Sequence, residues 1–552
     1  MENPISEARA CFADPFRLAK AGDEVVLLPA GGMANYGSGR PSDAFVSANA
    51  PLCEELGGAT MVLEGKVRPA LRFRFRGREV ALDRFSPRAT VLDWLREEQA
   101  ATGTKEGCAE GDCGACTVVL ARLKRGRLVH EAFNACIIFL GQLDGAELII
   151  VEDLAEGGAL HPVQQAMVDH HGSQCGFCTP GIVMSLFAAY HSGAPATVAS
   201  LCDQLAGNLC RCTGYRPILT AALATCDGAP TDRFAASAGE RAAALAALAD
   251  GSDVFVGDEE RFFAAPASLD SLATLYARFP DATLVGGATD VGLWVTKQLS
   301  DLKRIIWLGR VARLDKIEDS PRELNLGATL SLADAAPLLA EIHSDLGEMM
   351  RRFGSVQVRV SGTVGGNIAN GSPIGDLAPA LIALGGRVVL RRGATTRFLP
   401  LEDFFLAYGK QDRAPGEFVL SVTAPRLGEG QHYRAFKVSK RFDEDISAVM
   451  FGARIDVEGR RIVGARVAYG GMAATPKRAA AAERALMGAD LDEPASWRGA
   501  LSALASDFTP LTDQRASAAY RMTVAANVLE KTLIEISGAT APTRIGMLHA
   551  AE

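Results

Sequence analysis

The chain has 552 residues, which is too long for one hydrophobic core, so we expect several domains. Its composition, 48% hydrophobic and 22% charged, is that of a globular protein, and its net charge of -8 argues against a nucleic-acid-binding surface and favours small-molecule or protein partners. No apolar run approaches the ~20 residues of a membrane helix and no secretory signal opens the chain, so we expect a cytoplasmic protein.

Residues 1–68 have turn composition and no sustained hydrophobic periodicity. We therefore predict a poorly ordered N-terminal extension and assign it no function. Two strands are predicted next. Over 71–75 apolar residues alternate with arginines, which is the period of a half-buried strand, and Gly77 turns the chain into a return strand that begins at Val80.

A helix and a third strand complete this first unit. Thr90-Val-Leu-Asp93 resembles a capping box, with Asp in place of the usual Glu, and it predicts a helix over 91–98. The apolar run Cys116-Thr-Val-Val-Leu120 predicts a strand. The order strand, turn, strand, helix, cysteine-rich loop, strand predicts a small α+β domain.

Four helices are predicted between His161 and Cys226, where the hydrophobic period becomes helical. Their starts are Pro162 before a helix over 163–171, Thr179-Pro180, Thr197 as the cap of a helix that ends near Gly207, and Pro217. Four helices in about sixty residues predict a compact bundle. Two hairpins of helices related by a local two-fold would bring the loops of this bundle together.

The rest of the chain predicts a linker and two further α+β units. Residues 227–259 are rich in Ala, Gly, Ser and Asp and indicate a linker that is in part helical. The third unit has predicted strands at 282–285, 304–308 and 324–326, and the fourth has strands near 432–438, 447–456 and 462–469 and a helix near 515–534.

The chain contains twelve cysteines, a number that indicates a structural or metal-binding role for at least some of them. Disulfide frameworks belong to small secreted domains, whereas this chain is large and carries no secretory signal. Most of the cysteines crowd into about a hundred residues, while Cys11 and Cys53 stand apart. Clustered thiolates in a reducing compartment usually hold metal.

The first group of cysteines has the spacing of a plant-type [2Fe–2S] site: Cys108, Cys113, Cys116 and the more distant Cys136. The glycines at 107, 111 and 114 allow the backbone to wrap closely and to direct N–H groups at the sulfurs. A structural zinc site would favour two tight pairs, so the spacing favours iron–sulfur.

The second group pairs Cys175 with Cys178 and Cys210 with Cys212. By spacing alone zinc stays open here, because zinc sites built from four cysteines use similar pairs. His170 and His171 lie nearby, but they are better placed to end the first helix of the bundle. We expect Cys202 and Cys226, which fall on helix faces, to be core thiols.

Two glycine turns suggest a nucleotide site. Gly286-Gly287 follows a predicted strand, and a second turn at Gly365-Gly366 is followed by Asp376 and a helix. Such turns can hold pyrophosphate through backbone N–H groups, although most of them bind nothing. The G-x-G-x-x-G fingerprint is absent, so a Rossmann domain is not indicated.

Longer sequence segments resemble the molybdenum hydroxylase family. Gly103-Thr-Lys-Glu-Gly-Cys-Ala-Glu-Gly-Asp-Cys-Gly-Ala-Cys116 is similar to the first cluster-binding segment of that family. Gln174-Cys-Gly-Phe-Cys-Thr-Pro-Gly181 and Gly207-Asn-Leu-Cys-Arg-Cys-Thr-Gly-Tyr-Arg-Pro217 are similar to its second. With these segments the zinc interpretation becomes remote. The resemblance implies iron ligands at Cys108, Cys113, Cys116, Cys136, Cys175, Cys178, Cys210 and Cys212.

Two further segments resemble the FAD-binding segments of xanthine dehydrogenases, Leu284–Val291 and Thr363–Asp376. Val419 departs from the leucine that the resemblance leads us to expect. The resemblance implies FAD contacts at Leu284, Val285, Gly286, Gly287, Ala288, Thr289, Asp290, Val291, Phe353, Thr363, Val364, Gly365, Gly366, Asn367, Asp376, Val419 and Lys437. The charged segment Lys440–Ile446 resembles a loop that borders the flavin where NAD+ binds, and its alternative is a solvated run of charges.

The resemblance runs from about 70 to 535 and implies a multidomain α+β fold. The implied parts are an N-terminal extension (1–68), a β-grasp ferredoxin-like [2Fe–2S] domain (69–153), a four-helix-bundle [2Fe–2S] domain (154–227), a linker (228–259), an FAD-binding domain of the molybdenum hydroxylase type (260–428) and a C-terminal α+β domain (429–540).

The implied function is that of the small subunit of a bacterial xanthine dehydrogenase. A molybdopterin-binding partner subunit, expected in a heterotetramer, would hydroxylate hypoxanthine or xanthine with water. Electrons would pass through the bundle cluster and the plant-type cluster to FAD and then to NAD+. No residue of this chain is then expected to be catalytic toward the purine.

Three alternatives remain at this point. The same architecture could serve an aldehyde, carbon monoxide or an N-heterocycle, although the fused order of cluster and flavin segments favours xanthine dehydrogenase. The chain could be a stand-alone module that passes electrons from NADH to an acceptor. A non-catalytic zinc scaffold would contain zinc and show no visible absorbance.

Overall fold

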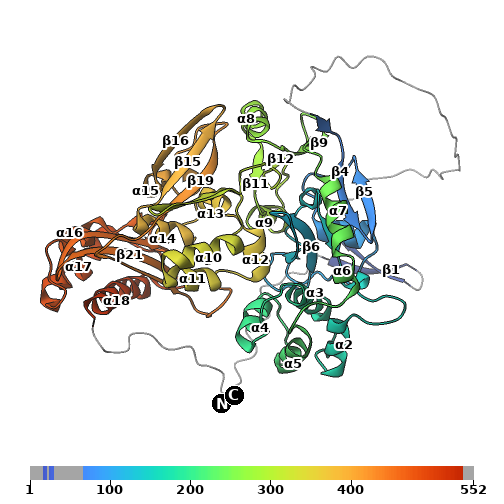
Figure 1. The fold of residues 1–552 in the computed structure, drawn as a ribbon, viewed down its shortest axis with the longest axis horizontal. Helices are drawn as coiled ribbons and strands as arrows, with labels where there is room; N and C mark the ends of the chain where they lie inside the picture. The colour runs from blue at the N-terminus through green and yellow to red at the C-terminus, as the bar shows by residue number, and fades with distance from the viewer. Residues whose placement is uncertain (1–15, 22–23, 30–65, 539–552) are drawn as a thin grey trace. The chain divides into compact units, whose positions relative to one another are not determined.

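The computed structural model describes residues 16–21, 24–29 and 66–538 (Figure 1). Residues 1–61 form one unit and residues 62–552 another. In the first unit, β1 (Phe16–Ala21) and β2 (Glu24–Pro29) form an antiparallel hairpin, in a segment for which we predicted no sustained structure. Val67–Arg68, at the end of the segment predicted to be poorly ordered, form the strand β3, and its residues up to 65 other than those of β1 and β2 lie outside the described residues.

The second unit begins with a five-stranded sheet of order β5-β4-β8-β6-β7, in which β4 and β8 are parallel. Its strands are β4 (Leu71–Phe75), β5 (Arg78–Leu82), β6 (Thr117–Lys124), β7 (Arg127–Asn134) and β8 (Glu147–Ile149). The predicted alternation is confirmed, because the apolar residues of β4 are buried. The capping box at Thr90 is also confirmed, and it opens α1 (Val91–Asp93), which continues as one π-helical turn (Trp94–Glu98). Two 3-10 turns, Leu140–Leu143 and Val151–Asp153, flank β8.

The predicted bundle consists of α2 (Pro162–Asp169), α3 (Thr179–Tyr190), α4 (Val198–Leu205) and α5 (Arg216–Thr225). The first helix ends two residues earlier than predicted, because His170 caps it and His171 takes a positive φ of 55°. Cys226 is buried as predicted. The prediction for Cys202 is wrong: this residue is exposed, since the buried face of α4 is formed by Leu201 and Leu205.

The segment predicted as a linker contains more structure than we expected. It forms α6 (Arg233–Ala236), α7 (Ala238–Leu248) and β9 (Asp253–Gly257), and α7 lies against β6 (Figure 1). β9 pairs with β10 (Phe262–Ala265), so the end of the linker belongs to the next sheet. The strand was missed because its buried Val254 and Val256 are flanked by Asp, Ser and Gly, which have turn composition.

The third part contains two five-stranded sheets. The first has the order β11-β12-β10-β9-β3, and the second has the order β13-β14-β19-β15-β16. The remaining strands are β3 (Val67–Arg68), β11 (Thr283–Val285), β12 (Arg304–Trp307), β13 (Ile317–Asp319), β14 (Glu323–Gly327), β15 (Arg387–Arg392), β16 (Thr395–Pro400), β17 (Phe405–Ala407), β18 (Lys410–Gln411) and β19 (Phe418–Pro425). The helices are α8 (Leu269–Arg278), α9 (Val291–Thr296), α10 (Leu332–Ile342), α11 (Ser344–Arg351), α12 (Val356–Ser361), α13 (Val364–Asn370), α14 (Leu377–Leu384) and α15 (Leu401–Phe404).

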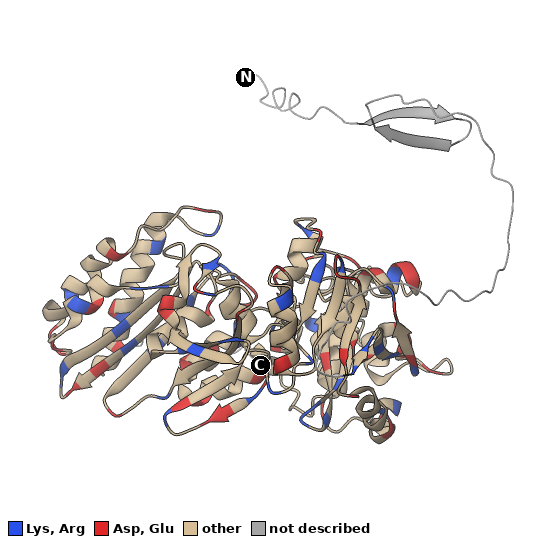
Figure 2. Ribbon diagram, turned by 90° about the horizontal axis from the view of Figure 1, so that it is seen from above, with Lys and Arg blue, Asp and Glu red and all other residues tan. Residues whose placement is uncertain are grey.

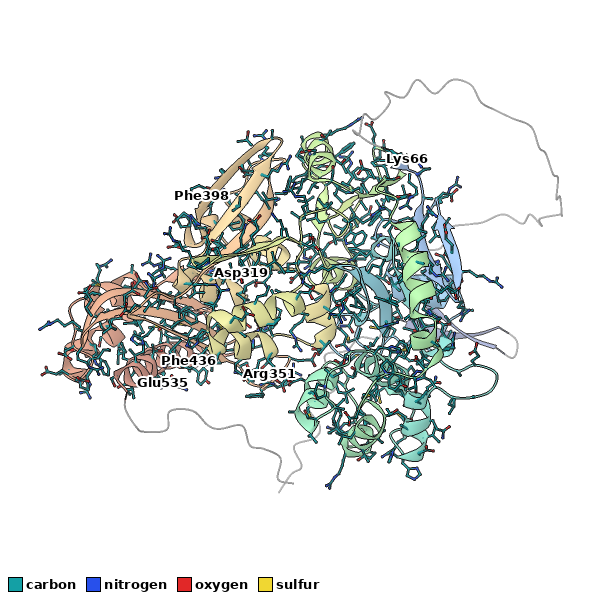
Figure 3. The ribbon with its side chains drawn as sticks, in the orientation of Figure 1. Lys66, Asp319, Arg351, Phe398, Phe436 and Glu535 are labelled. Carbon is teal, nitrogen blue, oxygen red and sulfur yellow. The ribbon has the colours of Figure 1, made fainter. Side chains whose placement is uncertain are left out.

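The C-terminal part is a four-stranded antiparallel sheet of order β20-β21-β22-β23 with three helices. Its elements are β20 (Gln431–Val438), β21 (Val449–Glu458), β22 (Arg461–Gly470), β23 (Lys477–Arg478), α16 (Ala480–Leu486), α17 (Pro494–Asp507) and α18 (Ala518–Ser537). Figure 3 labels Phe436 on β20 and Glu535 on α18, and Arg434 of β20 donates to Glu535 at 2.6 Å. The helix α14 packs on β21 and β22 and so joins this part to the preceding one.

Charged residues of both signs are interspersed over the described elements (Figure 2). Among the described residues, no helix is both long enough and apolar enough to cross a membrane. The multidomain mixed α/β architecture expected from the sequence is confirmed.

Candidate functional site

The structure brings the four cysteines of the first group together. Cys108 and Cys113 are half-buried, whereas Cys116 and Cys136 are buried. The backbone N–H of Cys113 donates to the sulfur of Cys108 at 3.4 Å. The thiols of Cys113 and Cys136 hydrogen-bond to Cys108 and lower the pKa of Cys108 well below its ordinary value. A thiolate at this position is the form that a metal site requires.

The loop around the first group needs its glycines. Gly111 and Gly114 have φ values of 78° and 68°, which L side chains rarely adopt. A Cβ on Gly107 would lie 2.8 Å from the sulfur of Cys113. The sequence did not identify a role for Asn134. Its side-chain amide donates to the carbonyl of Gly111 at 2.8 Å and so stabilises the loop. The loop therefore fits a small inorganic cluster held close to the backbone.

The second group lies on two loops of the helical bundle, between α2 and α3 and between α4 and α5. Its sulfurs meet in two pairs, Cys178 with Cys210 and Cys175 with Cys212. Burial, together with a hydrogen bond to Cys210, raises the pKa of the Cys178 thiol to about 12, so a bound metal would have to displace that proton. The four cysteines of this group supply four ligands, so no histidine is needed. Cys175 and Cys212 are exposed, which places this group at the surface of the chain.

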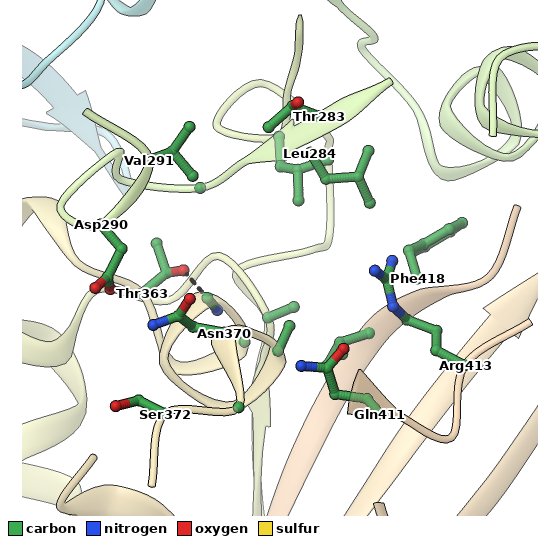
Figure 4. A pocket seen from close by; sticks show the side chains of 18 of the residues that line it. Thr283, Leu284, Asp290, Val291, Thr363, Asn370, Ser372, Gln411, Arg413 and Phe418 are labelled. Atoms are coloured by element: carbon green, nitrogen blue, oxygen red, sulfur yellow. Dashed lines mark hydrogen bonds between the residues drawn. The ribbon is translucent and has the colours of Figure 1, made fainter. Parts of the chain in front are cut away.

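The two glycine segments line a cavity of about 600 Å³ (Figure 4). Leu284 and Val291 come from the first segment, Thr363 and Asn370 from the second, and Arg413 reaches in from beyond the β17–β18 hairpin. The prediction of a second glycine turn is wrong, because Gly365 and Gly366 form the first turn of α13 behind the cap Thr363. Glycine is needed there for close approach, since a Cβ on Gly365 would lie 2.5 Å from Ala328.

A second cavity, of about 260 Å³, adjoins the first and shares with it Thr289, Asp290 and Thr363, among others. Phe353, Asn367, Asp376 and Lys437 line it, and the buried Ser447 contacts the last two of these residues. Lys437 Nζ lies 2.7 Å from an oxygen of Asp376, and the hydroxyl of Ser447 donates to the other oxygen at 2.6 Å. The two cavities thus adjoin through shared lining residues, and a buried ion pair forms part of the wall of the second.

The residues predicted to contact FAD divide into four sets by position. Thr289, Asp290, Thr363 and Gly366 line both cavities; Leu284, Gly286, Ala288, Val291, Gly365 and Val419 line the first; Phe353, Asn367, Asp376 and Lys437 line the second. Val285, Gly287 and Val364 line neither cavity. Val285 and Val364 are buried in the core, and Gly287 packs so tightly on Ser361 that a Cβ would lie 1.6 Å from the Ser361 carbonyl oxygen.

Several lining residues were missed from the sequence. Asn370 and Ser372 lie inside the second glycine segment and could have been included from it. Gln411 and Arg413 carry no sequence signal, because tertiary packing brings their hairpin to the cavity. The Nε atom of Arg413 and the Oδ1 atom of Asn367 are buried without a hydrogen-bond partner among the described residues. These two atoms, one at each cavity, fit a polar ligand such as a dinucleotide.

The charged segment 440–446 borders the second cavity through Glu444, Asp445 and Ile446. Burial and the nearby carboxylate of Asp112 raise the pKa of Glu444 to about 8, against the opposing effect of Arg441. Arg352 holds the segment, because its guanidinium donates to the carbonyls of Phe442 and Lys437 at 2.9 Å each. Part of this segment therefore lies against the cavity, and the interpretation as a run of solvated charges fits only the rest of it.

The first cysteine group also reaches the second cavity. Glu110, between Cys108 and Cys113, and Ile137, next to Cys136, both line it. A Cβ on Gly292 would lie 2.4 Å from the carbonyl oxygen of Ile137, so the backbones of the two parts are in contact. The space that fits a dinucleotide thus opens directly onto the cysteine loop.

Four protein-family models match the chain in succession. They are a 2Fe-2S iron-sulfur cluster binding domain (74–140), a [2Fe-2S] binding domain (150–223), an FAD binding domain in molybdopterin dehydrogenase (258–427) and a CO dehydrogenase flavoprotein C-terminal domain (434–536). Both cysteine groups fall within the two cluster-binding matches, and both glycine segments fall within the FAD match.

Similar proteins include xanthine dehydrogenases from several organisms. That of Emericella nidulans is 30% identical over 527 residues, which cover 85% of this chain and 38% of that protein. Xanthine dehydrogenase 2 of Arabidopsis thaliana is 31% identical over 471 residues, covering 72% of this chain and 35% of that protein. The chain thus spans well under half the length of these curated relatives.

Among solved structures, the carbon monoxide dehydrogenase from Hydrogenophaga pseudoflava resembles about half of the chain. It is 24% identical, and the match covers 49% of this chain and 95% of that one with a TM-score of 0.47. The family assignment rests on the four domain matches, which follow one another along most of the second unit. The chain belongs to the molybdenum hydroxylase family, as a part that bears two [2Fe–2S] domains and an FAD-binding domain.

Proposed function

We propose that this chain is the iron–sulfur and FAD subunit of a cytoplasmic xanthine dehydrogenase. It would carry electrons from a molybdopterin-binding partner subunit, which oxidises hypoxanthine or xanthine, through the second and then the first cysteine group to FAD and NAD+. The similarity to xanthine dehydrogenases supports the substrate class. We further propose that the chain and its partner form a heterotetramer.

One observation carries this proposal: the loop of the first cysteine group forms part of the wall of the second cavity, through Glu110 and Ile137. Bound there, the clusters would supply one-electron transfer and FAD the exchange between one-electron and two-electron chemistry. The residues of the chain position these groups. Asp376 and Lys437, which hydrogen-bond to each other and to the buried Ser447, give the cavity a fixed polar section of wall.

The exposed end of the second cysteine group is our proposed docking site for the molybdopterin partner. Cys175 and Cys212 are exposed there, and so are the apolar side chains of Phe177, Leu209 and Tyr215. Exposed apolar groups beside an electron-carrying site favour a protein partner, since they would be covered on binding. The docked partner would then lie next to the site that receives its electrons.

For the domain limits we propose those expected from the sequence, except that the segment expected to be a linker contains helices and a strand. We propose a cluster domain over 69–153, a helical cluster domain over 154–227, an FAD-binding domain over 260–428 and a C-terminal domain over 429–540. The intervening 228–259 forms α6 and α7 and adds β9 to the sheet of the FAD-binding domain.

Co-purification tests the proposal. We expect the chain to purify with a molybdenum-containing subunit and the complex to reduce NAD+ in the presence of hypoxanthine. Reduction of oxygen alone would contradict the dehydrogenase assignment. Turnover of aldehydes or N-heterocycles without turnover of purines would contradict the substrate assignment.

A further inference from the structure

A buried cluster of four polar side chains joins three parts of the chain. Thr117 begins β6 directly after Cys116, Ser185 lies on α3 of the bundle, and Asn208 lies two residues before Cys210. Gln357 comes from α12 of the FAD-binding part. Their exposed fractions are between 0% and 2%, so their polar atoms depend on partners within the protein; Gln357 Oε1 alone of these side-chain atoms has none among the described residues.

The hydrogen bonds of this cluster require a donor at Gln357. The hydroxyl of Thr117 donates to the carbonyl of Gly114 at 2.7 Å, and that of Ser185 donates to Asn208 Oδ1 at 2.6 Å. Both hydroxyl oxygens can then only accept, and the Gln357 amide nitrogen shares its two hydrogens among these oxygens, at 3.2 Å each, and Asn208 Oδ1, at 3.0 Å. The side-chain amide of Asn208 in turn donates to the carbonyl of Gly114 at 3.1 Å.

This cluster lies beside a direct link between the two cysteine groups. The backbone N–H of Leu209 donates to the carbonyl of Cys113 at 3.0 Å. Cys113 belongs to the first group, and Leu209 precedes Cys210 of the second. The loops are in contact, because a Cβ on Gly114 would lie 2.0 Å from the Gly207 carbonyl oxygen. One hydrogen bond and the covalent bonds of three residues therefore connect a sulfur of each group.

We propose that Gln357 is a positioning residue for electron transfer between the two cluster sites. By donating to Asn208 and Thr117 at once, it holds the two loops at the separation that the hydrogen bond from Leu209 to Cys113 requires. The step it serves is a one-electron exchange in which one site is oxidised as the other is reduced, and no bond or proton changes place. The inference rests on the proposed function, since both cluster sites must be occupied.

The FAD-binding part thereby acts at two points on the electron path. It forms the cavity beside the first cysteine group, and through Gln357 it also fixes the contact between the two groups. Gly207 fits this arrangement, because a Cβ there would lie 2.4 Å from Gln357 Oε1 and 2.4 Å from Ser355 Cβ. The surface of the FAD-binding part is thus shaped to the cluster loops.

The test uses the purified full chain and the substitution Gln357→Met, which keeps the length of the side chain and removes its donors. After a flash of photochemical reduction, freeze-quench EPR follows how electrons redistribute between the two [2Fe–2S] signals. We expect both signals at full intensity and a redistribution rate that falls several-fold. Thr117→Val preserves shape and removes the hydroxyl that accepts from Gln357 and donates to Gly114. It should slow the rate as well and serves if the first variant does not fold.

The matched control is Gln204→Leu. Gln204 Nε2 donates to the main-chain carbonyl of Ser185 at 3.0 Å and touches no other member of the cluster in the hydrogen bonds of the described residues. We expect its redistribution rate to equal that of the unmodified chain. Unchanged rates in both Gln357→Met and Thr117→Val would overturn the inference and leave the proposed function standing. An unmodified chain with only one cluster signal would overturn both.

Discussion

The buried ion pair in the wall of the second cavity gives a prediction whose size follows from its burial. The side chains of Lys437 and Asp376 are 3% and 2% exposed, and their charged atoms lie 2.7 Å apart. Lys437→Met removes the positive charge and leaves the carboxylate with only the hydroxyl of Ser447 among its side-chain partners. Breaking a buried pair by removing one partner costs about 3–5 kcal/mol, because the remaining charge is uncompensated.

A double-mutant cycle separates this cost from lost packing. We expect Asp376→Asn in the Lys437→Met background to recover much of the loss, since no charge is then left buried. The assay is urea unfolding followed by flavin fluorescence at a fixed excess of FAD, because bound ligand adds its own stabilisation. The control Lys316→Met breaks a pair with Glu318 whose side chains are 51% and 53% exposed, and it should cost at most about 1 kcal/mol. A Lys437→Met effect no larger than that of the control, or strict additivity in the cycle, would refute the reasoning.

Two further predictions concern the cavity walls. Gly287→Ala should destabilise the FAD-binding part by about 1–3 kcal/mol in thermal unfolding, because its Cβ would collide with the Ser361 carbonyl. The control Gly239→Ala, in α7, has open space around it and should be neutral or stabilising. Glu444 stays protonated in the folded chain up to its pKa of about 8 but ionises near pH 4.3 when unfolded, so unfolding releases a proton between these values. Stability should therefore fall as pH rises from about 5 to 8, and Glu444→Gln should flatten that slope; an equal slope in the variant would contradict the assignment.

Local sequence signals predicted the elements that local chemistry determines. The capping box at Thr90, the cap Thr197 and the alternation over Leu71–Phe75 are all present in the structure. The two cysteine groups could also be predicted, because the spacing of their cysteines is a local feature of the sequence. The cluster-binding and FAD-binding domains that the resemblance implied are confirmed by the family matches.

Features set by distant contacts could not be predicted in this way. Arg413 reaches the cavity only because the β17–β18 hairpin folds over it, and Gln357 meets Asn208 across 149 positions of sequence. β9 has linker composition and becomes a strand because β3 and β10 flank it. The second glycine segment is helical rather than a turn, since Thr363 caps α13, and the exposure of Cys202 depends on which face of α4 meets α3.

Low-temperature EPR of the reduced, purified chain tests the central claim most directly. The account predicts two distinguishable [2Fe–2S] signals, of which Cys113→Ser removes one and Cys178→Ser removes the other. Each variant should keep the remaining signal and its bound FAD, because the two groups lie on separate loops of separate domains. Stoichiometric zinc without visible absorbance, or the survival of both signals in either variant, would contradict the account.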